Sequence, residues 1–144
     1  MTAVTWSGPE TTHPARTASR RSMDAVSRGA KEEWLDLFAA DAVVEDPVGK
    51  SMFDPTGNGH RGHDGIGAFW EMTIANVERF EFEIRDSFAA GDEVANVGTI
   101  TTYLRGSRVD TAGVFVYRVN DDGLIVSMRA FWETERAMAT LRQV

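Results

Sequence analysis

Cysteine is absent from this sequence, and basic side chains are scarce. Without cysteine, disulfide bonds and metal sites built on thiolates are excluded. The 144 residues include 15 lysines and arginines against 22 acidic residues, which gives a formal net charge of −7. Nucleic acids and anionic membranes bind proteins through basic surfaces. We therefore expect neither a nucleic-acid partner nor a membrane partner.

Long apolar runs are absent as well. No stretch approaches the roughly 18 apolar residues that a membrane-spanning helix needs, and the first residues lack the apolar segment of a signal peptide. These features lead us to expect a soluble, cytoplasmic protein. Hydrophobic residues still make up 42% of the chain, which is enough for the core of one ordinary domain.

The first 17 residues show no hydrophobic periodicity. They are rich in threonine and contain two of the four prolines of the chain. A segment of this composition is typical of a flexible tail. We therefore predict a tail over residues 1–17 and a single domain over residues 18–144.

Three helices are predicted in the first half of the chain. Weak apolar periodicity over residues 18–29 predicts a helix that ends at Gly29. The segment KEEWLDLFAADA, residues 31–42, predicts a second helix because its apolar residues share one side. A third helix is expected over about residues 63–77, where apolar residues recur at helical spacing.

The second half of the chain predicts strands. From residue 80, phenylalanine and isoleucine alternate with charged residues. The turn sequences AAGDE, RGS and NDDG then separate three further strands, at 94–104, 109–119 and 124–132. Helices followed by such a meander indicate an α+β fold, with three N-terminal helices packed in the concave face of a curved, mainly antiparallel sheet. A curled sheet covered by helices leaves a pocket.

The segment VVEDPVG, residues 43–49, carries two adjacent carboxylates on a short predicted strand that ends at Pro47. Successive side chains of a strand point to opposite faces. Glu45 and Asp46 must therefore face opposite sides, so one of them faces inward. A carboxylate in an apolar interior is unfavourable by several kcal/mol unless it is paired, so an inward one is either a structural cost or a catalytic group. Asp46 could also be an ordinary turn residue, since Asp-Pro is common in turns.

Three segments resemble the ketosteroid isomerases, which belong to the nuclear transport factor 2-like superfamily together with SnoaL-like proteins. They are LFAADAVVEDPVG, FW in the third predicted helix, and VFVYRVNDDGLIVSMRAFW near the C-terminus. The resemblance runs from about Ser22 to Trp132 and implies a cone-shaped α+β domain. The superfamily includes isomerases, dehydratases, cyclases, epoxide hydrolases and binding proteins, so the fold alone does not identify the activity.

The resemblance implies that Asp46 is a general base that moves a proton next to a carbonyl group. In the family, an oxyanion hole made of a tyrosine and a protonated aspartic acid stabilises the enolate. The matching positions here are Ser22 and Phe115. Phe115 cannot donate, and the Ser22 hydroxyl is shorter than a phenol. Because each lost donor costs roughly 2.7–4 kcal/mol, we expect weak or altered isomerase activity.

The resemblance also implies a ligand pocket lined by apolar residues of the family's steroid site. The implied residues are Phe69, Phe115, Met128 and Trp132, all of which would also serve as ordinary core. Met128 and Trp132 share a face of the last predicted strand. Tyr117 lies two residues from Phe115 on the same face, so its phenol is either a replacement donor or part of the pocket wall.

No metal or cofactor is expected. His60 and His63, in HRGH, lack a third ligand at a suitable spacing, and GNGHRG lacks the strand and helix that flank a phosphate loop. Arg129 is predicted to face away from the pocket, in an ion pair or a subunit contact. The resemblance implies a homodimer formed through the outer face of the sheet.

Two hypotheses follow for the function. In the first, Asp46 is the base of an isomerase-like enzyme that acts on a steroid-like or polyketide-like ketone, with Tyr117 or a water as the partner of the ketone oxygen. In the second, the protein binds a steroid or similar apolar ligand without turnover, and Asp46 accepts a hydrogen bond from a ligand hydroxyl. A dehydratase, cyclase or epoxide hydrolase would use the same carboxylate with different partners.

Overall fold

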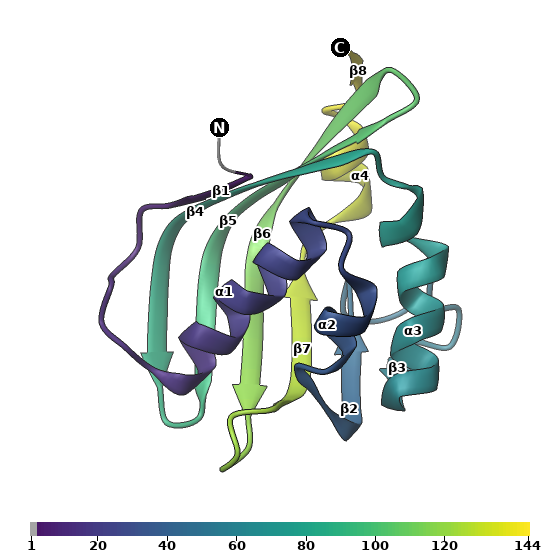
Figure 1. Cartoon of the computed structure of the whole chain (residues 1–144). Coiled ribbons are helices and arrows are strands. Elements are labelled where there is room, and N and C mark those ends of the chain that lie inside the picture. Colours follow the sequence, from purple (N-terminus) through teal and green to yellow (C-terminus); the bar gives the residue numbers. More distant parts are fainter. Residues whose placement is uncertain (1–2) are drawn as a thin grey trace.

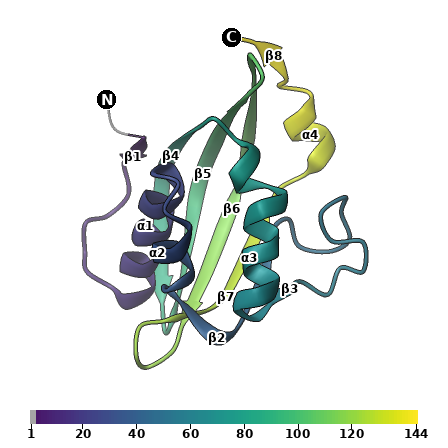
Figure 2. The same ribbon diagram turned by 45° about the vertical axis from the view of Figure 1, so that its right-hand side comes forward.

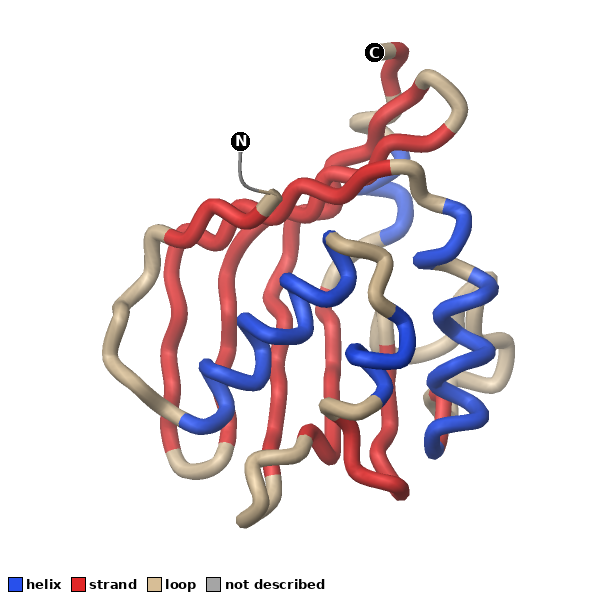
Figure 3. The backbone as a smooth tube through the Cα atoms, in the orientation of Figure 1, coloured by secondary structure: helices blue, strands red, loops and turns tan. Residues whose placement is uncertain are grey.

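Helices from the first half of the chain pack on one face of a strongly bent sheet in the computed structural model, which describes residues 3–144 (Figure 1). Figure 3 shows helices, in blue, in front of the red strands, and a further helix near the C-terminal end. The prediction of an α+β fold with helices in the concave face of a curved sheet is confirmed.

Four α-helices and one 3-10 helix are present in the described part of the chain. Their bounds are α1 Pro14–Ser27, α2 Lys31–Leu35, α3 Gly62–Met72, η1 Ile74–Asn76 and α4 Thr134–Met138. No helix among residues 3–144 is both long and apolar enough to cross a membrane.

The strands form one mixed sheet in the order β1-β4-β5-β6-β7-β2-β3, with β8 paired to β6. The bounds are β1 Val4–Trp6, β2 Phe38–Glu45, β3 His60–Arg61, β4 Arg79–Ala90, β5 Glu93–Leu104, β6 Ser107–Val119, β7 Ile125–Phe131 and β8 Arg142–Gln143. β4 to β7 form the predicted antiparallel meander. Two pairs are parallel, β1 with β4 and β2 with β7.

The second predicted helix is shorter than its sequence pattern suggests. Helix α2 ends at Leu35, and β2 already begins at Phe38. Phe38 pairs with Ile125 of β7, and its ring lies edge-on to Trp34 with centroids 4.8 Å apart. Pairing with β7 therefore outweighs the local helical periodicity, because tertiary contacts override weak propensities.

The N-terminal region differs from the predicted tail over residues 1–17. Val4–Trp6 forms β1 beside β4, and α1 begins at Pro14, where proline favours a helix start. The guanidinium of Arg20 lies 4.3 Å from the centre of the Trp6 ring. Residues 1 and 2 lie outside the described residues, and the domain boundary at residue 18 stays a prediction.

The sheet bends at a bulge in β4. Register between β4 and β5 shifts between Ile84 and Asp86, opposite Gly98. A Cβ atom on Gly98 would lie only 2.2 Å from the carbonyl oxygen of Glu83, so only glycine permits this approach. Bulges increase local twist and bending, and the turned view in Figure 2 shows the long strands curving around α1 and α3. This curvature creates the interior in which the candidate site lies.

Candidate functional site

Asp46 follows the last residue of β2 and lies where the sheet meets the helices. The Trp132 indole nitrogen donates a hydrogen bond to its Oδ1 at 2.6 Å. The residue keeps some accessible surface because it borders a cavity, but the surrounding protein desolvates the carboxyl group. This desolvation raises the pKa of Asp46 above its ordinary value, and the Trp132 hydrogen bond offsets part of that rise.

Glu45 points to the opposite side of the sheet, as the alternation of a strand requires. Its Oε2 accepts from Arg129 Nε at 2.8 Å, and both side chains are partly exposed. The predicted ion pair of Arg129 away from the pocket is confirmed. Of the two adjacent carboxylates, Asp46 is therefore the one that borders the interior.

An inner cavity of about 80 Å³ lies between the helices and the sheet. It brings together six of the seven predicted site residues: Asp46, Ser22, Phe69, Phe115, Tyr117 and Met128. Their side chains come from α1, α3, β6, β7 and the end of β2. Because most of the cone is filled by large apolar side chains, the free volume is small and the lining is predominantly apolar.

Trp132 is the exception, since it does not line the inner cavity. Strand β7 ends at Phe131, so the alternation that would place Trp132 beside Met128 no longer holds. The indole instead lies at the border between Asp46 and the outer side of the sheet. The predicted ligand-binding role of Trp132 stays a prediction, and its hydrogen bond to the carboxylate was not expected from the sequence.

Ser22 and Tyr117 form a buried chain of hydrogen bonds with Trp34. The Trp34 indole nitrogen donates to Ser22 Oγ at 3.0 Å, and Ser22 Oγ lies 3.3 Å from Tyr117 Oη. Burial is the main reason why the pKa of Tyr117 is raised to about 12; the Ser22 hydrogen bond lowers it and the nearby charge of Asp46 raises it. Tyr117 is therefore a neutral phenol near pH 7 and is able to donate.

These three hydrogen-bonded groups have one more N–H or O–H donor than the hydrogen bonds between them require. Trp34, Ser22 and Tyr117 each supply one proton, but only two hydrogen bonds join the three groups. Among the described residues, neither hydroxyl has a further acceptor. Because both hydroxyls line the cavity, the remaining proton is available there to a water or a ligand.

The carboxylate of Asp46, in contrast, has an acceptor oxygen for which the described part of the protein supplies no donor. Among residues 3–144, only Trp132 donates to it, and only to Oδ1. Its Oδ2 is an acceptor without a donor, although a carboxylate accepts several hydrogen bonds. The same small cavity therefore presents a spare acceptor at Asp46 and a spare donor at Ser22 or Tyr117.

Asn96 is a further polar residue of the cavity wall that sequence patterns did not single out. Its side-chain oxygen accepts from Ser87 Oγ at 2.8 Å, and its nitrogen donates to Ser19 Oγ at 3.0 Å. Arg16 Nε donates to the same Ser87 hydroxyl at 3.0 Å. These bonds fasten α1 to β4 and β5 beneath the cavity, so Asn96 is a structural anchor of the site.

The two histidines of HRGH serve separate structural contacts. His63 Nε2 lies 2.8 Å from the carbonyl oxygen of Phe38, and the His60 ring packs against Phe69 with centroids 4.8 Å apart. Within the described part of the chain, no group of three or more histidine, aspartate or glutamate residues could hold a metal ion.

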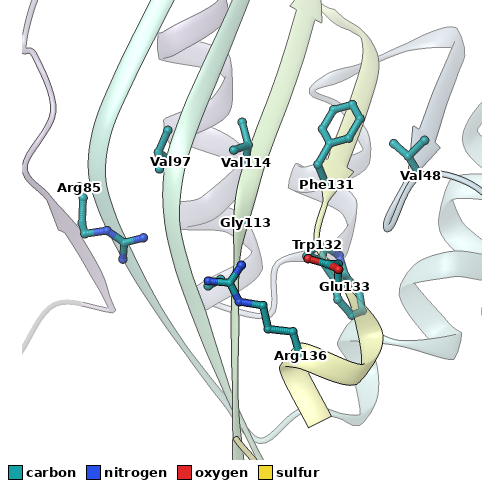
Figure 4. A pocket seen from close by; sticks show the side chains of 10 residues that line it. Val48, Arg85, Val97, Gly113, Val114, Phe131, Trp132, Glu133 and Arg136 are labelled. Carbon is teal, nitrogen blue, oxygen red and sulfur yellow. The ribbon is translucent and has the colours of Figure 1, made fainter. Parts of the chain in front are cut away.

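A larger hollow of about 520 Å³ lies on the opposite, outer face of the sheet (Figure 4). Its floor consists of Val97, Val114 and the backbone of Gly113, with Phe131 beside them. Arg85 from β4 and Arg136 from α4 reach over this floor from opposite sides (Figure 4). The hollow is open to solvent and is separated from Asp46 by Trp132.

Comparison with known proteins places this geometry in context. Residues 19–128 match the family model described as a SnoaL-like domain. A steroid Delta-isomerase of Nocardioides simplex is 30% identical over 118 residues, which cover 81% of this chain and 88% of that protein.

Two solved structures are similar over nearly the whole chain. The first is RV0760c of Mycobacterium tuberculosis in complex with estradiol-17beta-hemisuccinate, with 35% identity, a TM-score of 0.81 and coverage of 91% of this chain and 99% of that one. The second is a Delta 5-3-ketosteroid isomerase of a Mycobacterium species, with 33% identity, a TM-score of 0.81 and coverage of 92% and 100%.

Proposed function

Because the chain belongs to the SnoaL-like family, within the ketosteroid isomerase-like branch of the nuclear transport factor 2-like superfamily, we propose that it catalyses proton transfer next to a carbonyl group. The substrate is a steroid-like or polyketide-like ketone whose double bond moves into conjugation. Asp46 is the general base, and Tyr117 is the hydrogen-bond donor to the ketone oxygen.

This proposal rests on one observation: within the described part of the chain, the same apolar cavity contains a hydrogen-bond acceptor without a donor and a hydrogen-bond donor without an acceptor. Asp46 Oδ2 lacks a donor among the described residues, and the chain of Trp34, Ser22 and Tyr117 has a spare proton. A ketone with acidic hydrogens satisfies both, because its oxygen accepts the spare proton while the adjacent C–H faces the carboxylate. Donors that are already in place stabilise an enolate oxygen without reorganisation.

The environment of Asp46 suits a base that acts on a weak carbon acid. Desolvation raises its pKa, and a base is most effective when its pKa approaches the working pH. Asp46 takes a proton from the carbon beside the carbonyl, the enolate oxygen accepts from Tyr117, and Asp46 returns the proton two carbons further along. The carboxylate is regenerated, so no other reactant is needed.

Tyr117 compensates for the family donors that are missing at Ser22 and Phe115. When Ser22 donates to the phenol oxygen, Trp34 donates to Ser22 and all three dipoles align toward the ligand. Aligned hydrogen bonds strengthen one another in an interior of low dielectric. Ser22 thus supports a donor from β6 instead of acting as the oxyanion donor itself.

A second candidate function is steroid binding without turnover. It is favoured by Phe115, which fills space at the position of a family donor and is 6% exposed. In that case Asp46 Oδ2 accepts from a ligand hydroxyl. Dehydratase, cyclase and epoxide hydrolase activities remain alternatives of the same fold, since each uses a carboxylate in an apolar pocket.

The test is turnover of a 3-oxo-Δ5-steroid, followed by the absorbance of the conjugated enone. We expect Asp46→Asn to lower kcat roughly 10²- to 10⁴-fold and Tyr117→Phe to lower it roughly 10²- to 10³-fold. Glu45→Gln is the matched control, because Glu45 is the neighbouring carboxylate but faces outward. Micromolar binding without turnover in the unmodified protein would replace the isomerase proposal with the binding one.

A further inference from the structure

The side-chain amide of Asn96 has one N–H group that no hydrogen bond among the described residues uses. The amide nitrogen carries two protons, and only one of them is donated, to Ser19 Oγ at 3.0 Å. Asn96 is 1% exposed, so bulk water does not reach it, and it borders the inner cavity. A buried donor without a partner is unfavourable, so the cavity is the place where this N–H meets an acceptor.

The hydrogen bonds around Asn96 fix the direction in which its amide faces. Ser19 Oγ donates its only proton to the Arg16 carbonyl oxygen at 2.8 Å, so it can only accept from Asn96. Ser87 Oγ accepts from Arg16 Nε and donates to Asn96 Oδ1 at 2.8 Å. A flipped amide would bring the oxygens of Asn96 and Ser19 together with no proton between them. The free N–H is therefore held in place before any ligand arrives, as an effective donor requires.

Asn96 lies directly opposite Phe115, the position at which the resemblance to ketosteroid isomerases places a donor. The two residues are partners in the register of β5 and β6, and both line the inner cavity. Side chains of directly opposite residues begin only about 4.5–5.5 Å apart. A donor at Asn96 therefore serves the same part of the cavity as a side chain at position 115.

The free N–H of Asn96 and the phenol of Tyr117 are supported by the same elements. Asn96 and Tyr117 are diagonal neighbours on the inner face of β5 and β6, which α1 crosses (Figure 1). Helix α1 supplies one serine to each, Ser19 to Asn96 and Ser22 to Tyr117, and residues three apart are neighbours on a helix. Because a carbonyl oxygen has two lone pairs, one ketone oxygen between these groups can accept from both.

We propose that Asn96 is the second hydrogen-bond donor of the site and that its free N–H and the Tyr117 hydroxyl bind the same ligand oxygen. The identity of that oxygen, the ketone oxygen of the substrate, rests on the proposed function. Asn96 thus supplies from β5 the donor that Phe115 cannot supply from β6. The site therefore selects a ligand with a carbonyl oxygen at this end over a hydrocarbon of the same shape.

The first measurement observes the Asn96 amide in the unmodified protein. The chain has four asparagines, at positions 58, 76, 96 and 120, all within the described residues, and only Asn96 is buried. After selective nitrogen-15 labelling of asparagine, its side-chain protons are identified by slow exchange with solvent. We expect a 3-oxo-Δ4-steroid, the conjugated ketone that no longer reacts, to shift one of these protons downfield. Equal shifts with the same steroid lacking the 3-oxygen would overturn the proposal.

The second measurement compares the affinities of these two steroids for variants. Asn96→Leu removes the donor at similar volume, and we expect it to weaken binding of the 3-oxo-steroid about tenfold while the steroid without the oxygen changes by less than about twofold. Ser19→Ala is the matched control, because it removes the partner on α1 but leaves the N–H groups of Asn96. It should lower the urea midpoint and keep the preference for the 3-oxo-steroid. Equal losses for both steroids in Asn96→Leu would reduce Asn96 to its anchoring role.

Turnover of the 3-oxo-Δ5-steroid separates this proposal from the proposed function. Absence of turnover together with the expected shift and affinity ratio would refute proton transfer by Asp46 and leave Asn96 as a ligand donor. Unchanged turnover and affinity ratio in Asn96→Leu, with turnover impaired in Tyr117→Phe, would instead refute the role of Asn96 and leave the proposed function standing.

Discussion

Asp46 and Glu45 are neighbours in the chain but have different environments. Glu45 faces outward and pairs with Arg129, while Asp46 borders the inner cavity and receives one hydrogen bond, from Trp132. The alternation of a strand separates them, and the packing of the helices on the sheet desolvates only Asp46. The pKa of that residue is raised by burial as a result.

This raised pKa predicts how stability depends on pH. A carboxyl group with a raised pKa stabilises the fold below its unfolded pKa, and this contribution is lost as the pH rises through its folded pKa. Above that value the native protein contains an ionised, desolvated carboxylate. We therefore expect Asp46→Asn to unfold at the same temperature as the unmodified protein near pH 4 and at a higher temperature at pH 8.

Thermal unfolding at pH 4, 6 and 8, followed by circular dichroism, measures this difference. Glu45→Gln is the control, since loss of a partly exposed ion pair costs at most about 1 kcal/mol. A difference between Asp46→Asn and the unmodified protein that is the same at all three pH values would contradict the assignment of a raised pKa.

At the scale of the elements, the bend of the sheet depends on a contact between β4 and β5. The bulge near Asp86 requires the backbone of β4 to approach Gly98 closely. Without this bend the strands would be flatter and would not curve around α1 and α3. The volume of the inner cavity is therefore set partly by a glycine that does not line it.

Gly98→Ala should destabilise the protein. The added Cβ would lie 2.2 Å from the Glu83 carbonyl oxygen, so the two strands must separate. Overpacking of this kind costs roughly 1–3 kcal/mol, which urea unfolding measures. Gly67→Ala in α3 is the matched control, because its nearest neighbour would be 3.8 Å away, and alanine stabilises a helix interior by up to about 1 kcal/mol. Equal effects of both substitutions would refute the close approach.

At the scale of the whole molecule, most of the outer face of the sheet is uncovered, since among the described residues only the short helix α4 packs there, against β6. Phe131 is 44% exposed there, and the open hollow beside it has an apolar floor with arginines at its rim. We propose that a second copy of the chain covers this face, as the resemblance to ketosteroid isomerases implies. The inner cavity then lies on the far side of each sheet and stays accessible.

Light scattering after size-exclusion chromatography tests this assembly. We expect a mass of twice the 15.9 kDa of one chain. Val114→Glu should give monomers, because two buried like charges would face one another across the interface. Met72→Glu is the control, since Met72 is exposed on α3, away from the outer face. A monomeric unmodified protein, or a dimer that survives Val114→Glu, would exclude this interface.

Local sequence patterns were enough to predict the features that depend on neighbouring residues. Period-two alternation and turn residues predicted the meander, and alternation at Glu45 and Asp46 required one inward carboxylate. Three features could be found only in the folded structure: the end of α2 at Leu35, the contact of Trp132 with Asp46 across 86 positions of the chain, and the short distance between the hydroxyls of Ser22 and Tyr117. The free volume beside Asp46 was also decided by folding alone. Local periodicity reports which face a side chain occupies, but contacts and volumes depend on how distant elements pack together.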